Sequence, residues 1–311
     1  MIAVKVSVLL ITYNQEKYIE QAIKSILMQK TNFIWELLIG DDASTDRTAD
    51  IVKQYSNIET NNFTVKTIIR IENVGASRNL FDLIRKANGE YITVLEGDDY
   101  WLGENRLQTL ANFLNKHSEY STVSHKRERR NIHNELLGFD PSEKYVGNKI
   151  TLKEYENGHA YSAMGCMFRN IYKNTSDNYE SMYTVARNAC DLIMCYDMLM
   201  HGNVFVLNEV FGVYRVSSSE ENYCSRTKAI DIIKDYIALC QALVCFYGKR
   251  KKLLNRISFL QLDGIHYYNK HKMKEERKIF TSHISTNEKA RMIIRFPYYA
   301  IKKVQMKLKI K

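Results

Sequence analysis

Between residues 4 and 96, short apolar runs alternate with segments of helical spacing, and this alternation restricts the fold more than any other feature. The apolar runs are rich in β-branched residues and predict buried strands at 4–14, 35–42, 63–70 and 90–96. The intervening segments predict helices at 15–29, 44–55 and 76–89. This order of strands and helices is typical of a parallel sheet covered by helices on both faces.

Two local signals predict where helices begin and end. Ser44 or Thr45 is a typical N-terminal cap for the helix at 44–55, with Asp46 in its first turn. Gly89 is a typical stop signal for the helix at 76–89.

The pattern after residue 100 is looser. We expect helices at 102–117, near 151–157 and at 187–201. We expect one strand at 120–133, another at 162–170 and two short strands within 203–218. The rest of 134–160 has the composition of a loop, and nearly everything from 227 onward is helical in pattern.

The charge of the chain is concentrated at its C-terminal end. The formal net charge is +10, yet residues 226–311 alone contain 21 Lys and Arg against 6 Asp and Glu. A basic tail on an acidic body favours an anionic partner, such as lipid headgroups or nucleic acid. The alternative is a solvated, highly charged helical surface.

Several features predict a cytoplasmic protein. The N-terminal residues lead directly into a strand pattern without a signal-peptide cleavage site, and no apolar stretch reaches the length of a membrane span. The six cysteines form no C-x-x-C pair and have no zinc-ligand spacing, so we expect reduced thiols.

Polar side chains follow each of the four N-terminal strands. Thr12, Tyr13 and Asn14 follow the first strand, and Asp41 and Asp42 follow the second. The third strand is followed by ENVGASRN (72–79) and the fourth by EGDD (96–99). Ligands of open parallel sheets bind outside the carboxyl ends of the strands, so these residues predict a ligand site.

The EGDD turn places three carboxylates within four positions, Glu96, Asp98 and Asp99. Their mutual repulsion would raise their pKa values unless a cation lay between them. Mg²⁺ and similar hard cations are commonly held by one or two carboxylates together with substrate phosphates. The turn therefore indicates a divalent metal bound to a diphosphate; the alternative is a solvated acidic turn.

The ordered motifs TYN, DDASTD, ENVGASRN and ANGEYITVLEGDDYW resemble those of the family 2 glycosyltransferases, which have the glycosyltransferase A-type fold. The resemblance is close over residues 4–118 and loose to about 220. It implies an α/β catalytic domain at 1–225, with a mostly parallel nucleotide-binding sheet flanked by helices. Residues 1–118 would form the nucleotide-binding half and 119–225 the acceptor half. A helical basic C-terminal region, 226–311, would follow.

The resemblance also implies roles for the strand-end residues. Thr12, Tyr13 and Asn14 would lie at the nucleotide base. Asp42 would accept the imide hydrogen of uracil, which favours a UDP-sugar donor. Arg78 would contact the base or ribose, unless it is an ordinary helix-surface arginine.

The acidic turn matches the family's metal-binding motif, with a glutamate in place of its first aspartate. Glu96 would face the ribose or metal-bound water. Asp98, or Asp99, would ligate Mg²⁺ or Mn²⁺.

The second half of the chain would supply the acceptor site and the catalytic base. Asp191 matches the acid that opens a helix in the family, and it would remove the proton from the acceptor hydroxyl. Its alternative role is to cap that helix, and Asp197 is the second candidate. The run Tyr214–Arg215 lacks the histidine that often follows it in the family, so Arg215 or Ser217–Ser219 would contact the diphosphate.

The last segment, 290–311, interleaves apolar and aromatic residues with Arg and Lys. This composition is typical of an interfacial segment on an anionic membrane. The protein would then be peripheral on the inner face of that membrane. A helix packed against the catalytic domain or against a homodimer partner is the alternative, and no nucleic-acid-binding motif accompanies the charge.

The resemblance implies an inverting, metal-dependent glycosyltransferase. Its partners would be a nucleoside-diphosphate sugar and a glycan or lipid-linked acceptor in cell-surface polysaccharide synthesis. A sugar nucleotidyltransferase would want a glycine-rich loop after the first strand, and ITYNQEKY has no glycine. A basic membrane- or nucleic-acid-binding adaptor with a vestigial nucleotide pocket is the non-enzyme alternative.

Overall fold

The computed structural model describes residues 3–157, 161, 163–173, 178–189, 191–216 and 228–309. The chain divides into two compact units, Met1–Glu221 and Asn222–Lys311, each with its own hydrophobic cluster. The boundary predicted from the sequence, between 225 and 226, falls in the segment 217–227, which lies outside the described residues.

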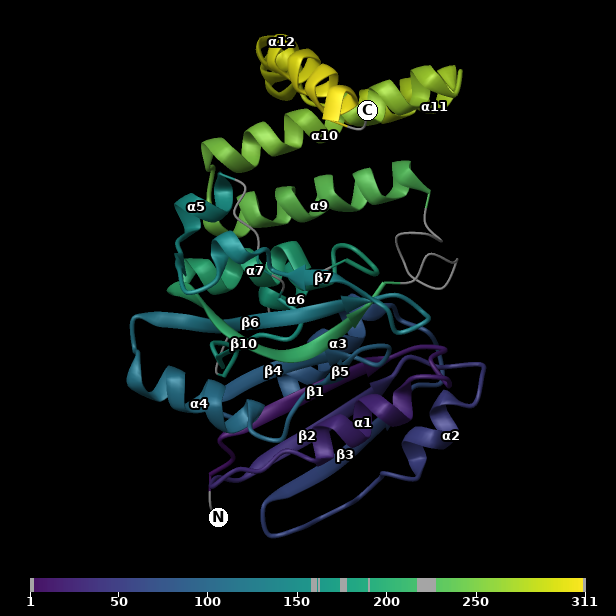
Figure 1. The fold of residues 1–311 in the computed structure, drawn as a ribbon. Coiled ribbons are helices and arrows are strands. Elements are labelled where there is room, and N and C mark those ends of the chain that lie inside the picture. Colours follow the sequence, from purple (N-terminus) through teal and green to yellow (C-terminus); the bar gives the residue numbers. More distant parts are fainter. Residues whose placement is uncertain are drawn as a thin grey trace. The chain divides into compact units, whose positions relative to one another are not determined.

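The first unit begins with the predicted alternation of strands and helices (Figure 1). These elements are β1 (Val6–Thr12), α1 (Ile19–Leu27), β2 (Trp35–Asp41), α2 (Thr48–Lys53), β3 (Phe63–Ile69), α3 (Ala76–Lys86) and β4 (Tyr91–Glu96). β1 lies between β2 and β4 and pairs in parallel with both, and β2 pairs in parallel with β3. The predicted α/β fold with a parallel sheet in its N-terminal part is therefore confirmed.

The rest of the first unit extends this sheet with strands of both directions. Its elements are β5 (Tyr100–Trp101), α4 (Arg106–Lys116), β6 (Tyr120–Arg130), β7 (Leu136–Asp140), a 3₁₀ turn (Glu143–Tyr145), β8 (Lys149–Ile150), α5 (Leu152–Glu156), β9 (Met167–Arg169), α6 (Asn178–Tyr183), α7 (Asp191–Met200) and β10 (Asn203–Arg215). In the described residues the sheet has ten strands, in the order β3-β2-β1-β4-β9-β6-β10-β5, with β7 on β6 and β8 on β10. Because β9 is antiparallel to both β4 and β6, the complete sheet is mixed.

Two expectations about this second part were wrong, and one helix was not predicted. Residues 203–215 form one long strand, and its register shifts near Val210 explain why the sequence pattern resembled two strands. The predicted loop at 134–160 contains the short strands β7 and β8, whose few residues carry too little alternation to be recognised. The short helix α6 also has no counterpart among the predicted elements.

Both predicted helix-end signals were also wrong. α2 begins at Thr48 after Arg47, because the hydroxyl of Ser44 is used by Asp41 instead of capping the helix. α3 ends at Lys86, before Gly89. A Cβ on Gly89 would lie 2.4 Å from the backbone nitrogen of Ser7, so this glycine permits a close approach to β1 and does not stop the helix.

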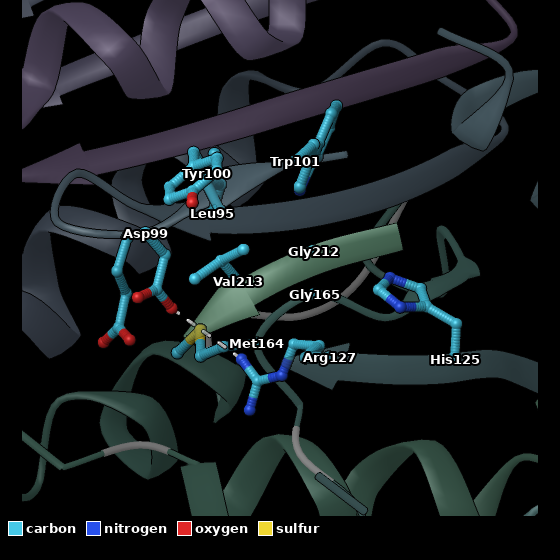
Figure 2. A pocket seen from close by; sticks show the side chains of 11 residues that line it. Leu95, Asp99, Tyr100, Trp101, His125, Arg127, Met164, Gly165, Gly212 and Val213 are labelled. Atoms are coloured by element: carbon cyan, nitrogen blue, oxygen red, sulfur yellow. Dashed lines mark ion pairs between the residues drawn. The ribbon is translucent and has the colours of Figure 1, made fainter. Parts of the chain in front are cut away.

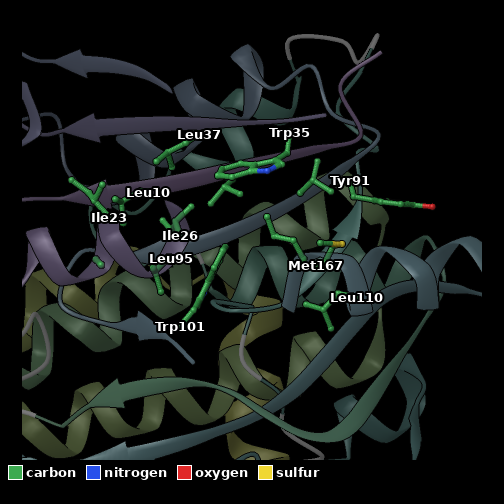
Figure 3. Close-up of a cluster of buried hydrophobic side chains, with 14 of the residues drawn as sticks. Leu10, Ile23, Ile26, Trp35, Leu37, Tyr91, Leu95, Trp101, Leu110 and Met167 are labelled. Atoms are coloured by element: carbon green, nitrogen blue, oxygen red, sulfur yellow. The ribbon is translucent and has the colours of Figure 1, made fainter. Parts of the chain in front are cut away.

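The strands alternate between two buried faces. Val6, Val8 and Leu10 of β1 join the main hydrophobic cluster, which includes Ile23 and Ile26 of α1 and extends to α4 (Figure 3). On the other side α3 packs against β1 and β2, and α3 and α6 are joined where the ring of Phe81 stacks on that of Tyr183. The sheet therefore lies between two helical layers, which leaves the ends of its strands accessible to a ligand.

The second unit is helical, as predicted. It consists of α9 (Ala229–Tyr247), α10 (Lys251–Lys270), α11 (Lys274–Ser282) and α12 (Thr286–Lys309). α10 packs against α9, α11 and α12, and the cluster between α10 and α12 contains Leu262, Ile284, Met292 and Tyr299. Within the described residues, none of the helices combines the length and the apolar character needed to span a bilayer.

Candidate active site

The strand register brings the predicted strand-end residues together. Thr12 at the end of β1 is paired with Asp41 at the end of β2. Ile11, the preceding residue, is paired with Glu96 at the end of β4. The polar side chains that the sequence placed after separate strands therefore share one edge of the sheet.

The loops after β1 and β2 are bonded to each other. The backbone N–H of Asn14 donates to the hydroxyl of Ser44 (2.9 Å), and the Asn14 side-chain oxygen accepts the N–H of Thr45 (2.8 Å). Asn14 has a φ of 54°, a left-handed conformation that asparagine tolerates better than most residues. Asn14 thus fixes the loop geometry, while Tyr13 beside it is exposed.

Gly97 lets the acidic turn lie directly against the end of β1. A Cβ at this position would lie 2.8 Å from the Thr12 hydroxyl oxygen and 2.5 Å from the side-chain oxygen of Gln15. The Thr12 hydroxyl itself donates to Gln15 (2.8 Å). The glycine in the EGDD turn is therefore required by packing.

Asp42 is buried and joins the loops after β2 and β3. Its two oxygens accept the backbone N–H groups of Val74 and Gly75, each at 2.8 Å. Burial raises the pKa of Asp42, and these two hydrogen bonds oppose the rise. Each carboxylate oxygen can accept more than one hydrogen bond, so these contacts leave room for a ligand N–H.

Arg78 extends from α3 toward α6. Its Nε donates to Asp82 (2.9 Å), and its guanidinium forms an ion pair with Glu180. Glu180 also pairs with Arg85 (3.3 Å). These contacts give Arg78 a place in a network of ion pairs; its predicted contact with base or ribose stays a prediction.

The acids of the EGDD turn lie close enough to affect one another. Burial raises the pKa of Glu96 well above its ordinary value, and the charges of Asp98, Asp191 and Asp99 raise it further. Burial raises the pKa of Asp98, and burial with the charge of Asp98 raises the pKa of Asp99 to about 8. Asp191, the first residue of α7, is therefore close enough for its charge to affect Glu96.

Arg127 of β6 is a site residue that the sequence analysis missed. It forms ion pairs with Asp99 (3.8 Å) and Asp140 (2.6 Å), and Figure 2 shows its guanidinium facing Asp99 across a small pocket. Its charge lowers the pKa values of Glu96, Asp99 and Asp191.

A signal for Arg127 was present in the sequence. Val123, His125 and Arg127 alternate along β6 and are all buried, so they share the inner face of the strand. A cation on the apolar face of a strand needs a buried partner, and that requirement could have identified it.

Arg215 is held against the acidic turn. Its backbone N–H donates to Asp99 (2.8 Å), and its guanidinium donates to the backbone carbonyl of Asp98. The guanidinium also lies over the rings of Tyr18 (4.9 Å) and Tyr100 (4.6 Å). Its predicted contact with diphosphate is untested, and Ser217–Ser219 lie outside the described residues.

Asp191 is the first residue of α7, and it is exposed to solvent. Desolvation by the surrounding protein raises the pKa of Asp191, and the charge of Arg127 opposes this rise. Asp197, the second candidate, is fully buried and accepts hydrogen bonds from the hydroxyls of Tyr172 (2.7 Å) and Tyr183 (3.0 Å). A buried carboxylate held in this way is suited to a structural role, which leaves Asp191 as the accessible acid.

The acidic turn fits a divalent cation that is held mainly by its ligand. In the described part of the chain, no three His, Cys, Asp or Glu side chains are arranged to hold a metal by themselves. Asp99 has partners in Arg127 and the Arg215 N–H, which leaves Glu96 and Asp98 as candidate ligands. One or two carboxylates together with phosphate oxygens are a typical Mg²⁺ environment, and the hard oxygen donors also suit Mn²⁺.

These raised pKa values predict that metal binding depends on pH. A cation needs ionised ligands, and the pKa values of both candidate ligands, Glu96 and Asp98, are raised, so the apparent affinity for Mn²⁺ should increase from about pH 6 to about pH 8. In the metal-free protein, Asp99 binds more protons in the folded state than in the unfolded state above about pH 3.8. Stability therefore falls as the pH rises toward about 8.

The measurement is thermal unfolding at about pH 6, 7 and 8, in the presence of Mn²⁺ or of EDTA. The difference between the two midpoints should widen with pH and should disappear in Asp98→Ala. A constant difference at all three values would contradict the prediction.

The fold and the site together define an α/β domain with a cluster of acidic side chains at its strand ends. Residues 7–174 match the family model for Glycosyl transferase family 2, which covers more than half of the chain. The chain belongs to glycosyl transferase family 2, and the predicted family is confirmed.

Relatives and solved structures agree with this assignment. The putative teichuronic acid biosynthesis glycosyltransferase TuaG of Bacillus subtilis is 26% identical over 259 residues, 81% of this chain and 96% of TuaG. The structure of Staphylococcus aureus TarS 1–349 with UDP-GlcNAc has a TM-score of 0.60 at 17% identity, covering 95% of this chain and 80% of that chain. The mannosyltransferase PcManGT of Pyrobaculum calidifontis, with GDP-Man and Mn²⁺, has a TM-score of 0.53 at 14% identity, covering 97% and 87%.

Higher sequence identity is found over a shorter stretch. An uncharacterized protein of Mycobacterium tuberculosis is 38% identical over 119 residues, which cover 38% of this chain and 34% of that protein. The match to this relative therefore spans about a third of its length (34%).

Proposed function

We propose that this protein is an inverting, metal-dependent glycosyltransferase that uses a nucleoside-diphosphate sugar, UDP-linked, as its donor. The acceptor is a hydroxyl of a glycan or of a lipid-linked saccharide in cell-surface polysaccharide synthesis. The polymers in the names of TuaG and of TarS, a poly(ribitol-phosphate) β-N-acetylglucosaminyltransferase, support this acceptor class.

The observation that carries the proposal is the electrostatic effect of Asp191 on the acidic turn. An exposed carboxylate on α7 acts electrostatically on Glu96, and both are influenced by Arg127. Two separate parts of the chain thus supply a diphosphate-binding turn and an accessible base to one site. A binding adaptor would have no use for this second carboxylate.

Support for the donor comes from Asp42 and from the solved relatives. A buried carboxylate that accepts N–H groups suits the ring N–H of uracil, and the TarS complex contains UDP-GlcNAc. The PcManGT complex contains GDP-Man, so a guanine nucleotide is the donor to compare. Its Mn²⁺ supports metal dependence, with Asp98 and Glu96 as the residues that would hold the cation.

In the proposed reaction, Asp191 accepts the proton of the acceptor hydroxyl while that oxygen bonds to the anomeric carbon. The bond from that carbon to the diphosphate breaks in the same displacement, so the configuration inverts. When bound, the cation neutralises charge on the departing diphosphate. Arg215, held beside the turn by Tyr18 and Tyr100, would contact a diphosphate oxygen.

We expect UDP to bind more tightly than GDP or dTDP, to require Mn²⁺ or Mg²⁺, and to bind weakly to Asp98→Ala. The reason is that the Asp98 carboxylate would hold the cation, and the positive charge of the cation would attract the diphosphate. The measurement is calorimetric titration of the purified protein with each nucleotide, with and without metal.

A matched control is Asp50→Ala, because Asp50 is an exposed acid of α2 whose ion pair is with Lys53. Its nucleotide binding should equal that of wild type. Tight, metal-independent UDP binding would contradict the metal part of the proposal alone. Failure of the wild-type protein to bind any of the three nucleotides would contradict the proposed donor and favour the adaptor.

A further inference from the structure

The last helix, α12 (yellow in Figure 1), exposes a stripe of large apolar side chains. Ile293 and Ile294 are 75% and 74% exposed, and Tyr298 and Ile301 are 55% and 56% exposed. Ile294, Tyr298 and Ile301 are four and three residues apart, so they lie on one side of the helix, and Ile293 adjoins them. A single exposed isoleucine is ordinary, whereas a contiguous stripe marks an interaction surface.

The stripe is not the face by which α12 packs on its own unit. Among the side chains of α12 that the structure describes, Met292 and Tyr299 are buried, and they pack in the cluster that includes Leu262 of α10. The Tyr299 hydroxyl donates to Asp263 (2.8 Å), which also pairs with Lys303 (2.7 Å). These contacts fix the rotation of α12 and leave the stripe exposed.

Basic side chains border the stripe. Arg291, Arg295 and Lys302 recur at helical spacing along one flank, and Lys289 lies on the other. The acid of this helix, Glu288, accepts hydrogen bonds from the Ser285 backbone (2.9 Å) and from the Gln261 side chain (3.1 Å). The negative charge is thus used within the unit, and the face around the stripe is positive.

We propose that α12 lies in the interface of an anionic lipid membrane. The isoleucines and Tyr298 enter the boundary between headgroups and acyl chains, and the flanking cations meet the lipid phosphates. This combination of an apolar face with basic flanks is the physical requirement for such binding. The proposal does not depend on the proposed catalytic function.

Other occupants fit the surface less well. A second copy of α12 would bring its own arginines and lysines against those of the first, and like charges repel. A nucleic acid would satisfy the cations, but its phosphates would leave the apolar stripe exposed to water. A lipid surface matches both the apolar stripe and the charges that border it.

The test is cosedimentation of the full chain with phosphatidylcholine vesicles that contain or lack phosphatidylglycerol. We expect binding to the anionic vesicles that weakens with salt. Ile294→Glu and Ile301→Glu should each lower the partition coefficient by about tenfold or more, because each removes an apolar side chain that the membrane would bury. Arg291→Gln and Lys302→Gln should each lower it by about fivefold.

Ile71→Glu is the matched control, because Ile71 is an isolated isoleucine of the first unit that is 98% exposed. It should bind vesicles as wild type does. No binding of wild type to anionic vesicles, or equal binding by Ile294→Glu, would overturn the proposal. The proposal would also be overturned if light scattering showed a wild-type dimer that Ile294→Glu converts to a monomer, and if vesicles had no effect on either protein. Nucleotide titrations of the same variants should be unchanged, which separates this proposal from the catalytic one.

Discussion

The Asp191→Asn variant is expected to lose about 10²–10⁴-fold in kcat while it keeps its affinity for the nucleoside diphosphate. The amide has nearly the size of the carboxylate and occupies the same first turn of α7, but it cannot accept the proton of the acceptor hydroxyl. The rate is measured as release of nucleoside diphosphate from the donor that the titrations identify, and the affinity by calorimetry. Because Asp191 has a raised pKa, the acid limb of the wild-type kcat profile should lie above 3.8.

The control for a purely structural role is Asp231→Asn. Asp231 also lies in the first turn of a helix, α9, so this change removes a comparable helix-end charge from the second unit. Either substitution should cost about 0.3–1 kcal/mol of stability through the helix dipole. If the two variants lose the same stability and both retain wild-type kcat, Asp191 only supports its helix and the proposed base is wrong.

Arg106→Ala is expected to lower the free energy of unfolding of the first unit by about 3–5 kcal/mol. The Arg106 guanidinium is completely buried, lies 4.0 Å from the centre of the Trp101 ring, and donates to His125 Nε2 and Thr93 Oγ1, both at 3.0 Å. Alanine leaves a cavity and removes the donor from these acceptors. Urea unfolding followed by tryptophan fluorescence reports on the first unit alone, because Trp35 and Trp101 are the only tryptophans.

Two further variants separate the contributions. Arg106→Met fills much of the cavity but cannot donate hydrogen bonds, so its stability should lie between those of wild type and Arg106→Ala. Arg47→Ala removes an exposed arginine that pairs with Glu16 and should cost no more than about 0.5 kcal/mol. A cost for Arg106→Ala similar to that of Arg47→Ala would show that the buried network contributes little.

The same network predicts a tautomer that sequence reasoning could not reach. His125 Nε2 accepts from Arg106, so its proton must be on Nδ1, which faces the carbonyl of Lys126 at 2.8 Å. Burial and the charge of Arg106 lower the pKa of His125 well below 6.5. His125 therefore opposes the folded state only as pH falls below about 6.5, where the unfolded chain binds the proton.

The candidate site was predictable where it depends on strand ends. Thr12, Asp42, Glu96 and Asp98 could be grouped from the sequence because parallel strands end at the same edge of a sheet. What could not be predicted is how their hydrogen-bonding capacity is used. Asp42 binds the N–H groups of Val74 and Gly75, and these contacts connect residues far apart in the chain.

The sequence by itself determined the order of strands and helices in the first unit, the acidic strand ends, the family and the helical basic end of the chain. These depend on local periodicity and on short motifs, which neighbouring residues specify. The tertiary structure alone decided that Arg127 faces Asp99, that Asp197 is enclosed by tyrosines, and that the apolar stripe of α12 faces outward. Each of these depends on which side chains meet across the fold, because burial and charge pairing are properties of contacts and not of positions in the chain.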